Sequence, residues 1–297
     1  MTVDLQEWVG RTKIEEDVAS GERARRLAVL LGDEAAAEPA VLFPLGHWLQ
    51  FPEDDVPMSE LGDDGHALLG GFMPPVGLTR RMWAGSALEF HSPIRPGQAL
   101  ARTSTIESVT EKAGRRGPLC FVVVRHEISA DGTLATIDRH TIVYREGTAP
   151  RGGTPDGGRS QAESAAAAPR SHTSAPEGWD WVRTVRPDEV MLFRYSALTF
   201  NSHRIHYDHP YVTGVEGYPG LIVHGPLTAT FLLDAFLRNH PNTEVTGYAF
   251  TAKSPVFVNE QIHLVGRKAE EGRYELEAVG PGGVTVMTAG VTAGERR

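Results

Sequence analysis

Histidines are concentrated in one short part of this 297-residue chain. His203, His206, His209 and His224 are four of its twelve histidines. Because imidazole has an ordinary pKa of about 6.5, it can accept a proton when neutral and donate one when charged at cellular pH. We therefore expect acid–base chemistry in this part of the chain, with His206 as the catalytic residue that transfers the proton.

Asn201 and Gly225 could complete a catalytic site around His206. The Asn201 amide does not titrate, but it could orient an attacking water molecule or the imidazole. Gly225 stands at the start of a predicted helix, where backbone N–H groups lack partners and the helix dipole favours negative charge. A thioester carbonyl bound there, with His224 beside it, would be polarised, and the enolate-like charge formed during water addition would be stabilised.

Charged and aromatic side chains in the same stretch could contact the substrate. Arg194 and Arg204 could bind a substrate carboxylate or a coenzyme A phosphate, because arginine forms bidentate hydrogen bonds with oxyanions. A structural ion pair is an equally open alternative for both arginines. We also expect His203 to line the substrate, and Tyr207 and Asp208 to support it without taking part in the chemistry.

Metal binding is an alternative use of these histidines. His203, His206 and His209 recur every three residues, a spacing that could place three ligands on one face of a helix. Pro210 and its aromatic and β-branched neighbours disfavour a long helix, and the sequence contains no His-Glu-x-x-His pattern and no carboxylate cluster here. We therefore expect no metal and no redox cofactor. A structural role stays open for the group and is favoured for His209.

The helix that begins at Gly225 can be predicted from its apolar pattern. Pro226 suits the first helical position, because its missing N–H would have no partner there anyway. An apolar stripe follows, formed by Leu227, Phe231, Leu232, Ala235 and Phe236. The run 239–241 (NHP) should end the helix.

A change of composition divides the chain into two units of similar size. Residues 147–177 are rich in glycine, alanine, serine and proline and contain no Phe, Trp or Tyr. Such a segment buries too little apolar surface to offset its ordering entropy, so we expect a flexible linker. It separates an N-terminal unit, residues 1–146, from a C-terminal unit, residues 178–297, which carries the histidines.

The two units share short sequence features, which favours an internal duplication over coincidence. Trp8 has a counterpart in Trp181, and the pair 92–93 (SP) has one in 254–255 (SP). Strand-like runs follow each pair, at 119–128 and 134–144 in the first unit and at 261–267, 273–279 and 284–292 in the second. The pair 131–132 (DG) is a strong hairpin signal. Each unit therefore predicts an antiparallel sheet wrapped around an apolar helix, an α+β fold.

The overall composition excludes several classes of protein. A net charge of −9 argues against broad nucleic-acid binding, which needs basic surfaces. Cys120 is the only cysteine, so neither an internal disulfide bond nor a cysteine-rich zinc site can form. The polar N-terminus lacks a signal-peptide core, and the apolar runs are shorter than the roughly 20 residues of a membrane span. We expect a cytoplasmic protein that does not associate with membranes.

Residues 200–206 (FNSHRIH) and 223–225 (VHG) resemble motifs of the hotdog-fold hydratases and dehydratases, in the MaoC-like branch. That branch carries Gly-Asp-x-Asn-Pro-(Ile/Leu)-His, and later His-Gly before a central helix. The resemblance places the family's catalytic histidine at His206, its catalytic aspartate at Asn201 and its carbonyl-binding glycine at Gly225. Because an amide cannot act as a general base, His206 must be the main acid/base group, or Asp208 or His203 must share the task.

Longer strings narrow the resemblance within this branch. Residues 200–208 (FNSHRIHYD), 216–227 (EGYPGLIVHGPL) and 72–85 (FMPPVGLTRRMWAG) are similar to double-hotdog enzymes that hydrate mesaconyl-CoA (3-methylfumaryl-CoA) or itaconyl-CoA. The resemblance implies reversible hydration of an α,β-unsaturated acyl-CoA, with a branched C5 dicarboxyl-CoA as substrate. The alternatives are dehydration of β-hydroxyacyl thioesters in fatty acid or polyketide metabolism, thioester hydrolysis, and thioester binding without catalysis.

The same resemblance implies a double hotdog of two antiparallel sheets, each around a central helix. Residues 31–34 (LGDE) take the place of the motif in the N-terminal unit and lack its histidine, so that unit should be non-catalytic and shape the acyl pocket. The expected partner is an acyl-CoA or an acyl-carrier thioester. Family members pair through sheet edges, so we also expect a homodimer or a higher oligomer.

Overall fold

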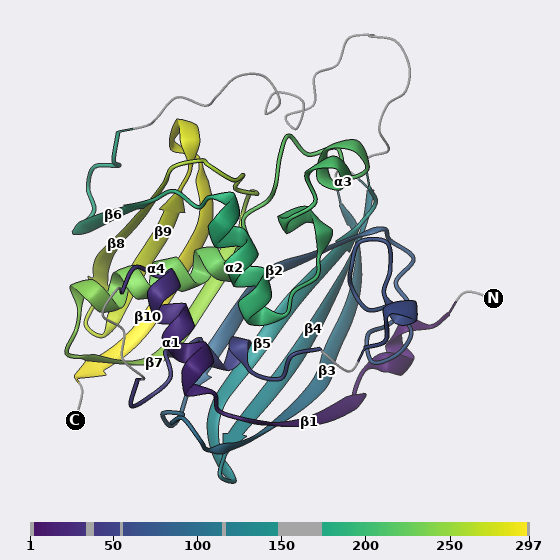
Figure 1. Ribbon diagram of the computed structural model, residues 1–297, viewed down its shortest axis with the longest axis horizontal. Coiled ribbons are helices and arrows are strands. Elements are labelled where there is room, and N and C mark those ends of the chain that lie inside the picture. The colour runs from purple at the N-terminus through teal and green to yellow at the C-terminus, as the bar shows by residue number, and fades with distance from the viewer. Residues whose placement is uncertain (1–2, 34–38, 54–55, 115–116, 148–173, 296–297) are drawn as a thin grey trace.

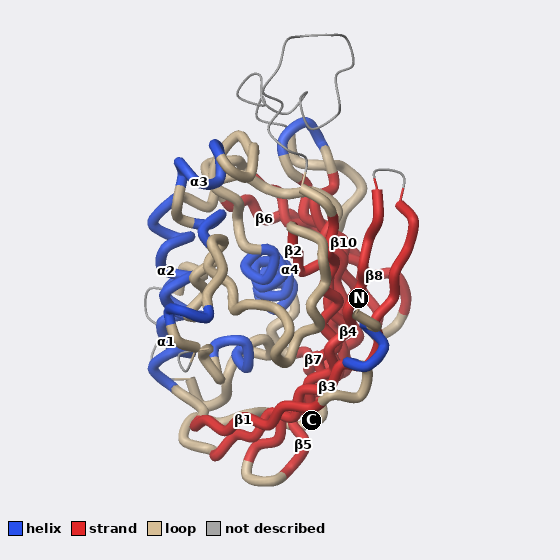
Figure 2. Tube along the Cα trace, turned by 90° about the vertical axis from the view of Figure 1, so that its right-hand side faces the viewer, coloured by secondary structure: helices blue, strands red, loops and turns tan. Residues whose placement is uncertain are grey.

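The computed structural model describes residues 3–33, 39–53, 56–114, 117–147 and 174–295. Most of the expected linker, residues 148–173, lies outside the described residues, as does residue 34 of the N-terminal motif. In the described part, a single large sheet carries the α-helices on one of its faces (Figures 1 and 2).

Ten antiparallel strands form this sheet in the described part of the chain. The N-terminal unit supplies β1 (Thr12–Val18), β2 (Arg80–Phe90), β3 (Ala99–Gly114), β4 (Gly117–Ala130) and β5 (Thr133–Arg145). The C-terminal unit supplies β6 (Trp181–Val185), β7 (Thr243–Ala252), β8 (Ile262–Glu270), β9 (Arg273–Val279) and β10 (Thr285–Glu295). Their order in the sheet is β1-β3-β4-β5-β2-β7-β10-β9-β8-β6. Followed inward from its own edge, the N-terminal half has the order β1-β3-β4-β5-β2 and the C-terminal half has the matching order β6-β8-β9-β10-β7. The two units therefore share one topology and lie edge to edge.

Strands β2 and β7 join the two units. They pair antiparallel, from Gly85 opposite Thr251 to Glu89 opposite Gly247. A side chain at Gly85 would clash with the backbone oxygen of Phe250, so this close pairing needs a glycine. The two sheets expected from the sequence are therefore the two halves of one continuous double-hotdog sheet.

The predicted strands are confirmed. Residues 119–128 and 134–144 lie within β4 and β5, which pair along their length. Asp131 and Gly132 connect them with φ angles of 48° and 77°. Positive φ at both positions is the geometry of the tight hairpin turn that an Asp-Gly pair favours. The three runs expected in the second unit lie largely within β8, β9 and β10.

Helix α4 (Gly225–Asn239) begins and ends where the sequence predicts. Its burial exceeds a one-sided stripe, because every residue from Leu227 to Phe236 is buried. The sheet covers one side of α4, and α1 (Gly21–Leu30) and α2 (Glu189–Thr199) lie on its other side (Figure 2). A helix that is buried on all sides belongs to the core. Among the described residues, no helix has the length and apolar character that a membrane crossing requires.

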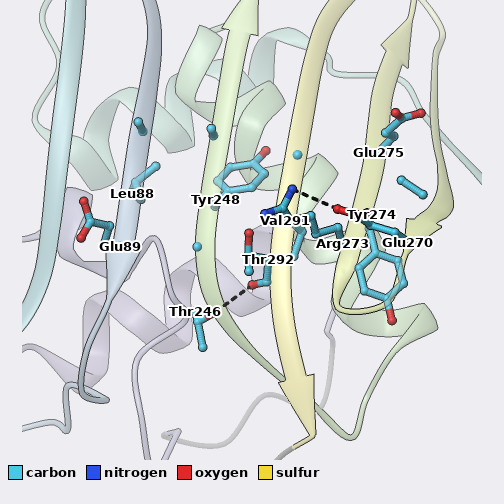
Figure 3. A pocket seen from close by; sticks show the side chains of 15 residues that line it. Leu88, Glu89, Thr246, Tyr248, Glu270, Arg273, Tyr274, Glu275, Val291 and Thr292 are labelled. Carbon is cyan, nitrogen blue, oxygen red and sulfur yellow. Dashed lines mark hydrogen bonds and ion pairs between the residues drawn. The ribbon is translucent and has the colours of Figure 1, made fainter.

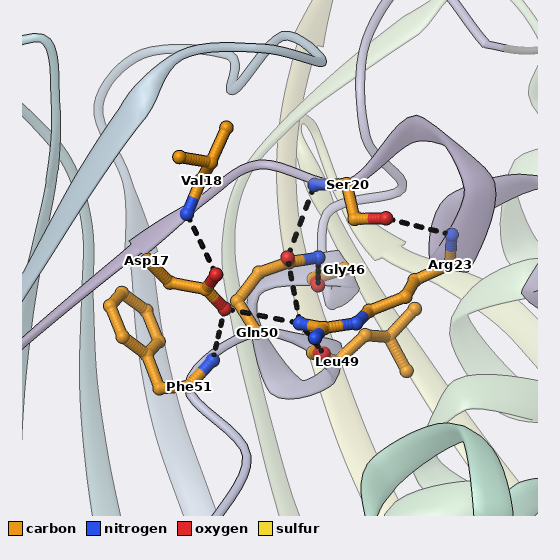
Figure 4. Close-up of polar contacts among 8 residues, drawn as sticks. All are labelled: Asp17, Val18, Ser20, Arg23, Gly46, Leu49, Gln50 and Phe51. Carbon is orange, nitrogen blue, oxygen red and sulfur yellow. Dashed lines mark hydrogen bonds and ion pairs between the residues drawn. The ribbon is translucent and has the colours of Figure 1, made fainter.

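A polar cluster holds the short elements of the N-terminal unit in place (Figure 4). The Asp17 carboxylate accepts hydrogen bonds from the backbone of Phe51 and from the guanidinium of Arg23. The Gln50 side chain accepts a bond from the backbone of Ser20, whose hydroxyl caps the start of α1. The cluster thereby ties α1 to the 3₁₀ turn η2 (Gly46–Leu49), which packs against α1 and α2.

Candidate active site

The loop between α2 and α3 (His209–Gly214) carries most of the candidate residues. After α2 ends, the Asn201 N–H donates to the Ser196 carbonyl at 2.9 Å, and Asn201 Oδ1 accepts the His203 N–H at 2.9 Å. Asn201 therefore shapes the turn. In the described residues no hydrogen bond joins it to His206, so its contacts do not favour the expected role in orienting the imidazole.

His206 lies buried in the short 3₁₀ turn η5 (Arg204–His206), with 7% of its surface exposed. Its Nδ1 atom is 2.7 Å from the carbonyl oxygen of Ile222. Because that oxygen can only accept, Nδ1 carries the proton and Nε2 keeps its lone pair. Burial lowers the pKa of His206 to about 4, so the ring is neutral at cellular pH. An oriented neutral imidazole of this kind can act as a general base.

His224 stacks on His206, with ring centroids 3.6 Å apart and ring planes 19° apart. Its Nε2 atom is 2.8 Å from Ser196 Oγ, and its Nδ1 atom is buried without a hydrogen-bond partner in the described residues. Burial, and repulsion from a protonated His206, lower the pKa of His224 well below its ordinary value. Both stacked rings are therefore neutral, and His224 Nδ1 is a polar atom that a bound ligand could satisfy.

Gly225, the residue after His224, is the first residue of α4. No side chain caps this helix end, and the Gly225 N–H has no partner among the described residues. A Cβ atom at Gly225 would meet only the carbonyl oxygen of Trp83, at 3.9 Å, so a ligand has room beside the backbone. The stack thus places a neutral imidazole next to an uncapped helix N-terminus, which could bind an anionic oxygen.

Two residues that sequence reasoning missed reach this loop from the N-terminal unit. The His66 ring centroid lies 4.1 Å from that of His203, which in turn lies 5.4 Å from that of His206. Asp64 Oδ2 accepts a hydrogen bond from His66 Nδ1 at 2.9 Å. Both residues belong to the string 62–66 (GDDGH), whose composition is typical of a turn. These residues predict a turn, but they do not show which part of the chain that turn packs against.

Burial controls the charge of these added histidines. It lowers the pKa of His203 to about 2, assisted by repulsion from His66 and His206. Burial and the charge of Arg81 lower the pKa of His66, against the opposite effect of Asp64. Among the described residues, no ion pair or hydrogen bond engages the Arg81 side chain on β2. Within the described part of the chain, Arg81 is therefore a cation without an ionic partner, and its charge acts on both histidines.

Asp64, His66 and His203 each offer a ligand atom within 4.8 Å of the others, a spacing that a divalent cation could bridge. However, His66 Nδ1 already donates to Asp64, and the positive charge of Arg81 acts on both histidines. The triple considered from the sequence is not assembled in the described chain, because His209 lies exposed at the start of α3. We therefore assign no metal ligand.

An ion pair accounts for two other expected contacts. Arg204 binds Asp208 Oδ2 at 2.7 Å, donates to the Asp63 carbonyl at 2.9 Å and stacks on the ring of Tyr211. Asp208 also caps α3 through the Tyr211 N–H. These contacts favour the structural ion pair that the sequence left open for Arg204, because the side chains of Arg204 and Asp208 are both engaged within the loop.

Tyr207 and Arg194 lie at the surface. Tyr207 is 48% exposed, and its hydroxyl donates to the Ser202 carbonyl at 3.0 Å, so it supports the loop. Arg194 is exposed on α2 and has no ion pair among the described residues. It is therefore available to an anion that arrives from solvent.

A second polar cluster lies inside the N-terminal unit, next to the site. Asp138 Oδ2 accepts a bond from Trp48 Nε1 at 2.7 Å and lies 2.7 Å from His140 Nε2. The other Asp138 oxygen is buried without a partner in the described residues. His140 packs on Trp83 with ring centroids 4.2 Å apart, and the Trp83 carbonyl faces Gly225. A polar and aromatic surface therefore adjoins the start of α4.

An open hollow lies away from these histidines, on the face of the sheet opposite α4 (Figure 3). Residues of β2, β7, β8, β9 and β10 line it, and no histidine is among them. Its three acidic residues are already paired, Glu89 with Arg139, Glu275 with Arg267 and Glu270 with Arg273. We assign it no catalytic role.

Proteins with similar sequences are hydratases and dehydratases. Residues 45–258 match the family model described as hydroxyacyl-thioester dehydratase type 2. The chain is 40% identical over 297 residues to mesaconyl-C(4)-CoA hydratase of Chloroflexus aurantiacus, covering 99% of each protein. It is 29% identical over 245 residues to the mitochondrial hydroxyacyl-thioester dehydratase type 2 of Schizosaccharomyces pombe, covering 70% of this chain and 72% of that protein.

Solved structures share the fold. A MaoC-like dehydratase from Phytophthora capsici superposes with a TM-score of 0.71 at 14% identity, covering 99% of this chain and 98% of that chain. A Mycobacterium tuberculosis protein described as having a double hotdog fold gives 0.51 at 14% identity, covering 96% of each chain. At these identities the likeness establishes the fold alone, which is a double hotdog.

Proposed function

The chain belongs to the hydroxyacyl-thioester dehydratase type 2 family, and from this membership we propose that it hydrates a C5 dicarboxyl enoyl-CoA such as mesaconyl-CoA. It is a hydro-lyase of the hydratase and dehydratase class. Similarity along the whole chain to mesaconyl-C(4)-CoA hydratase supports the substrate. The observation that carries the mechanism is the stack of His206 on His224, beside the uncapped start of α4.

In the proposed reaction, the thioester oxygen lies at the Gly225 N–H and the double bond faces His206. His206 Nε2 accepts a proton from water while the water oxygen bonds to the β-carbon. The electron pair of the double bond moves onto the thioester oxygen, where the helix N-terminus stabilises the enolate. The imidazolium then gives its proton to the α-carbon, so that one water molecule has been added and His206 is neutral again. The reverse sequence removes water.

We assign the free carboxylate of a dicarboxyl substrate to Arg81. The charge of Arg81 acts on His66 and His203, and no described residue pairs with it. Arg81 and Trp83 are two positions apart on β2 and share one face of the sheet, and the Trp83 carbonyl faces Gly225. An arginine in that position suits bidentate recognition of a carboxylate. Arg194, exposed on α2, is the proposed contact for a CoA phosphate.

The polar side chains inside the N-terminal unit favour a substrate with a short, polar acyl group. Sites for alkyl chains are lined mainly by apolar side chains. Here Asp138, Trp48 and His140 form a hydrogen-bonded cluster beside Trp83. Dehydration of a 3-hydroxyacyl thioester is the second candidate function, and the family match and the Schizosaccharomyces pombe relative favour it.

A substrate panel tests the proposal. With mesaconyl-CoA, we expect loss of the enoyl absorbance without release of free thiol, and slower loss with crotonyl-CoA. Release of thiol would identify a thioesterase, and saturable binding without either signal would identify a thioester binder. Faster turnover of a long-chain 3-hydroxyacyl-CoA would favour the second candidate.

Three further proposals rest on the family resemblance. The substrate is an acyl-CoA rather than a carrier-bound thioester, the protein is cytoplasmic, and it forms a homodimer or higher oligomer. In the described part, β1 and β6 are the outer strands of the sheet and offer its edges for pairing. Light scattering on the purified protein would measure the oligomeric state.

A further inference from the structure

The carboxylate that the family motif supplies is absent at position 201. The Asn201 amide oxygen accepts the backbone N–H of His203. Asp208, further along the same loop, is held by Arg204 and caps α3. Since neither residue is available to the histidines, an acidic group that acts on them must come from elsewhere in the fold.

A turn of the N-terminal unit, residues 61–67, is docked on the loop that carries the histidines. Ser202 Oγ donates to the Gly65 carbonyl at 2.5 Å, and the Arg204 N–H donates to the Asp64 carbonyl at 2.8 Å. The Arg204 guanidinium donates to the Asp63 carbonyl at 2.9 Å. Gly65 has a φ of 89°, and a Cβ atom there would clash with the Ser202 carbonyl. These bonds and this glycine fix the place of the turn.

The docked turn brings a carboxylate to the end of a row of four imidazoles. Asp64 Oδ2 accepts the His66 Nδ1 proton at 2.9 Å. From His66 the ring-to-ring distances are 4.1 Å to His203, then 5.4 Å to His206 and 3.6 Å to His224. We call these four rings the histidine row. Each ring packs against the next one in the row, so a positive charge on one ring affects its neighbours.

The row can hold little positive charge at a time. Burial lowers the pKa of each member, and a proton on one ring disfavours a proton on the next. Asp64 raises the proton affinity of His66 and His203, and Glu53 acts in the same direction on His66. Arg81 opposes both effects. Of these groups, only Asp64 is hydrogen-bonded to a ring of the row.

We propose that Asp64, through its hydrogen bond to His66, is the counter-charge for the proton that the histidine row holds during turnover, and that it replaces the carboxylate missing at position 201. This inference rests on the proposed hydration at His206. The proton leaves water for His206 Nε2 and is given to the α-carbon, and the negative charge of Asp64 stabilises the row in between. Asp64 is a positioning residue, because it acts through His66 and His203 and does not touch the substrate.

The first test is Asp64→Asn, which removes the charge and keeps an oxygen that can accept the His66 proton. We expect kcat for mesaconyl-CoA to fall about 10- to 100-fold, the range for losing one charge-assisted hydrogen bond. KM should change by less than about threefold, because the substrate contacts remain. The matched control is Asp63→Asn. The Asp63 side chain is exposed and only its backbone is used in the turn, so kcat should stay within about twofold.

Three outcomes would overturn the inference. One is an unchanged kcat in Asp64→Asn, and another is an equal loss in Asp63→Asn. The third is inactivation of the wild-type protein by a chelator with recovery on adding zinc, which would make the turn a metal site. A loss of activity that follows a lower melting temperature, or a higher KM alone, would assign Asp64 a structural role only.

A second measurement needs no turnover, so it separates this inference from the proposed function. Histidine ring signals can be followed by NMR against pH without substrate, with His66 assigned from the spectrum of His66→Gln. In Asp64→Asn the His66 pKa should fall, because the negative charge that opposes burial and Arg81 is lost while the acceptor oxygen remains. Asp63→Asn should leave it unchanged. An unchanged His66 pKa in Asp64→Asn sinks the inference even if the enzyme hydrates its substrate. A wild-type protein that hydrates no enoyl-CoA sinks the proposed function instead.

Discussion

The imidazole of His206 stacks on the imidazole of His224, with centroids 3.6 Å apart. A backbone carbonyl at Ile222 orients the first ring, and the Ser196 hydroxyl orients the second. In this buried place two charged rings would repel strongly, so the pair can carry one positive charge at most, that is, one proton more than two neutral rings. This is the charge behaviour that a general base requires, since the base must give up its proton before the next turnover.

The acid/base assignment predicts the effect of replacing His206. His206→Gln should reduce kcat by roughly 10²- to 10⁴-fold, because glutamine can hydrogen-bond but cannot take up a proton. Circular dichroism should show retained secondary structure. The matched control is His209→Gln, since that residue is exposed at the start of α3, and its kcat should remain near the wild-type value. Full activity in His206→Gln would contradict the assignment.

The proposed carbonyl site predicts that Gly225→Ala separates stability from activity. A methyl group there meets only the Trp83 carbonyl oxygen at 3.9 Å, and alanine favours a helix over glycine by up to about 1 kcal/mol. The melting temperature should therefore stay the same or rise. The methyl group would nevertheless occupy the space through which a thioester approaches the backbone, so kcat/KM should fall at least about tenfold. Unchanged steady-state kinetics would show that the thioester binds elsewhere.

Substitutions of Arg81 and Arg194 should differ in their effects on mesaconyl-CoA and crotonyl-CoA. Arg81→Ala should weaken binding of mesaconyl-CoA roughly 10- to 100-fold, the range for one charged hydrogen-bonded pair, and affect crotonyl-CoA little because crotonyl-CoA has no free carboxylate. Arg194→Ala should raise KM for both substrates alike, since a CoA phosphate is common to them. Steady-state kinetics with the two thioesters measure this difference. Equal effects of Arg81→Ala on both substrates would exclude a carboxylate contact.

Stability should decrease as the solution becomes more acidic than pH 6.5. Burial lowers the pKa of His206 to about 4 and of His203 to about 2, whereas in the unfolded chain both return to about 6.5. Between these values the unfolded state binds more protons than the folded state, so stability is present above pH 6.5 and is lost as pH falls. Each histidine contributes about 1.4 kcal/mol per pH unit.

Urea unfolding at pH 7 and pH 5 measures this dependence. The free energy of unfolding should be lower at pH 5, and His206→Gln should show a smaller difference between the two conditions. Activity should survive further into acid than an ordinary histidine allows, with its acid limb near pH 4 if the protein stays folded. A free energy of unfolding that rises on acidification would contradict the burial of neutral rings.

Local sequence patterns determined much of the fold. Pro226 at the first turn and the apolar run behind it predict α4 because they act within one helix. Asp131 and Gly132 predict their hairpin because positive φ is a property of those two residues. The short spacing from His203 to Gly225 also pointed to one site, and the structure brings His206 beside the helix start through the stack on His224.

Only the tertiary structure decided which distant residues join that site. Asp64, His66 and Arg81 come from the other unit. Their place depends on the pairing of β2 with β7 and on a turn that docks through hydrogen bonds to its backbone carbonyls. Backbone N–H and C=O groups are alike at every residue, so the side-chain pattern of a strand edge or a turn does not show which distant segment it will pair with. The same limit applies to Arg204. The sequence allows both a substrate contact and an ion pair, and only the folded loop shows the ion pair with Asp208.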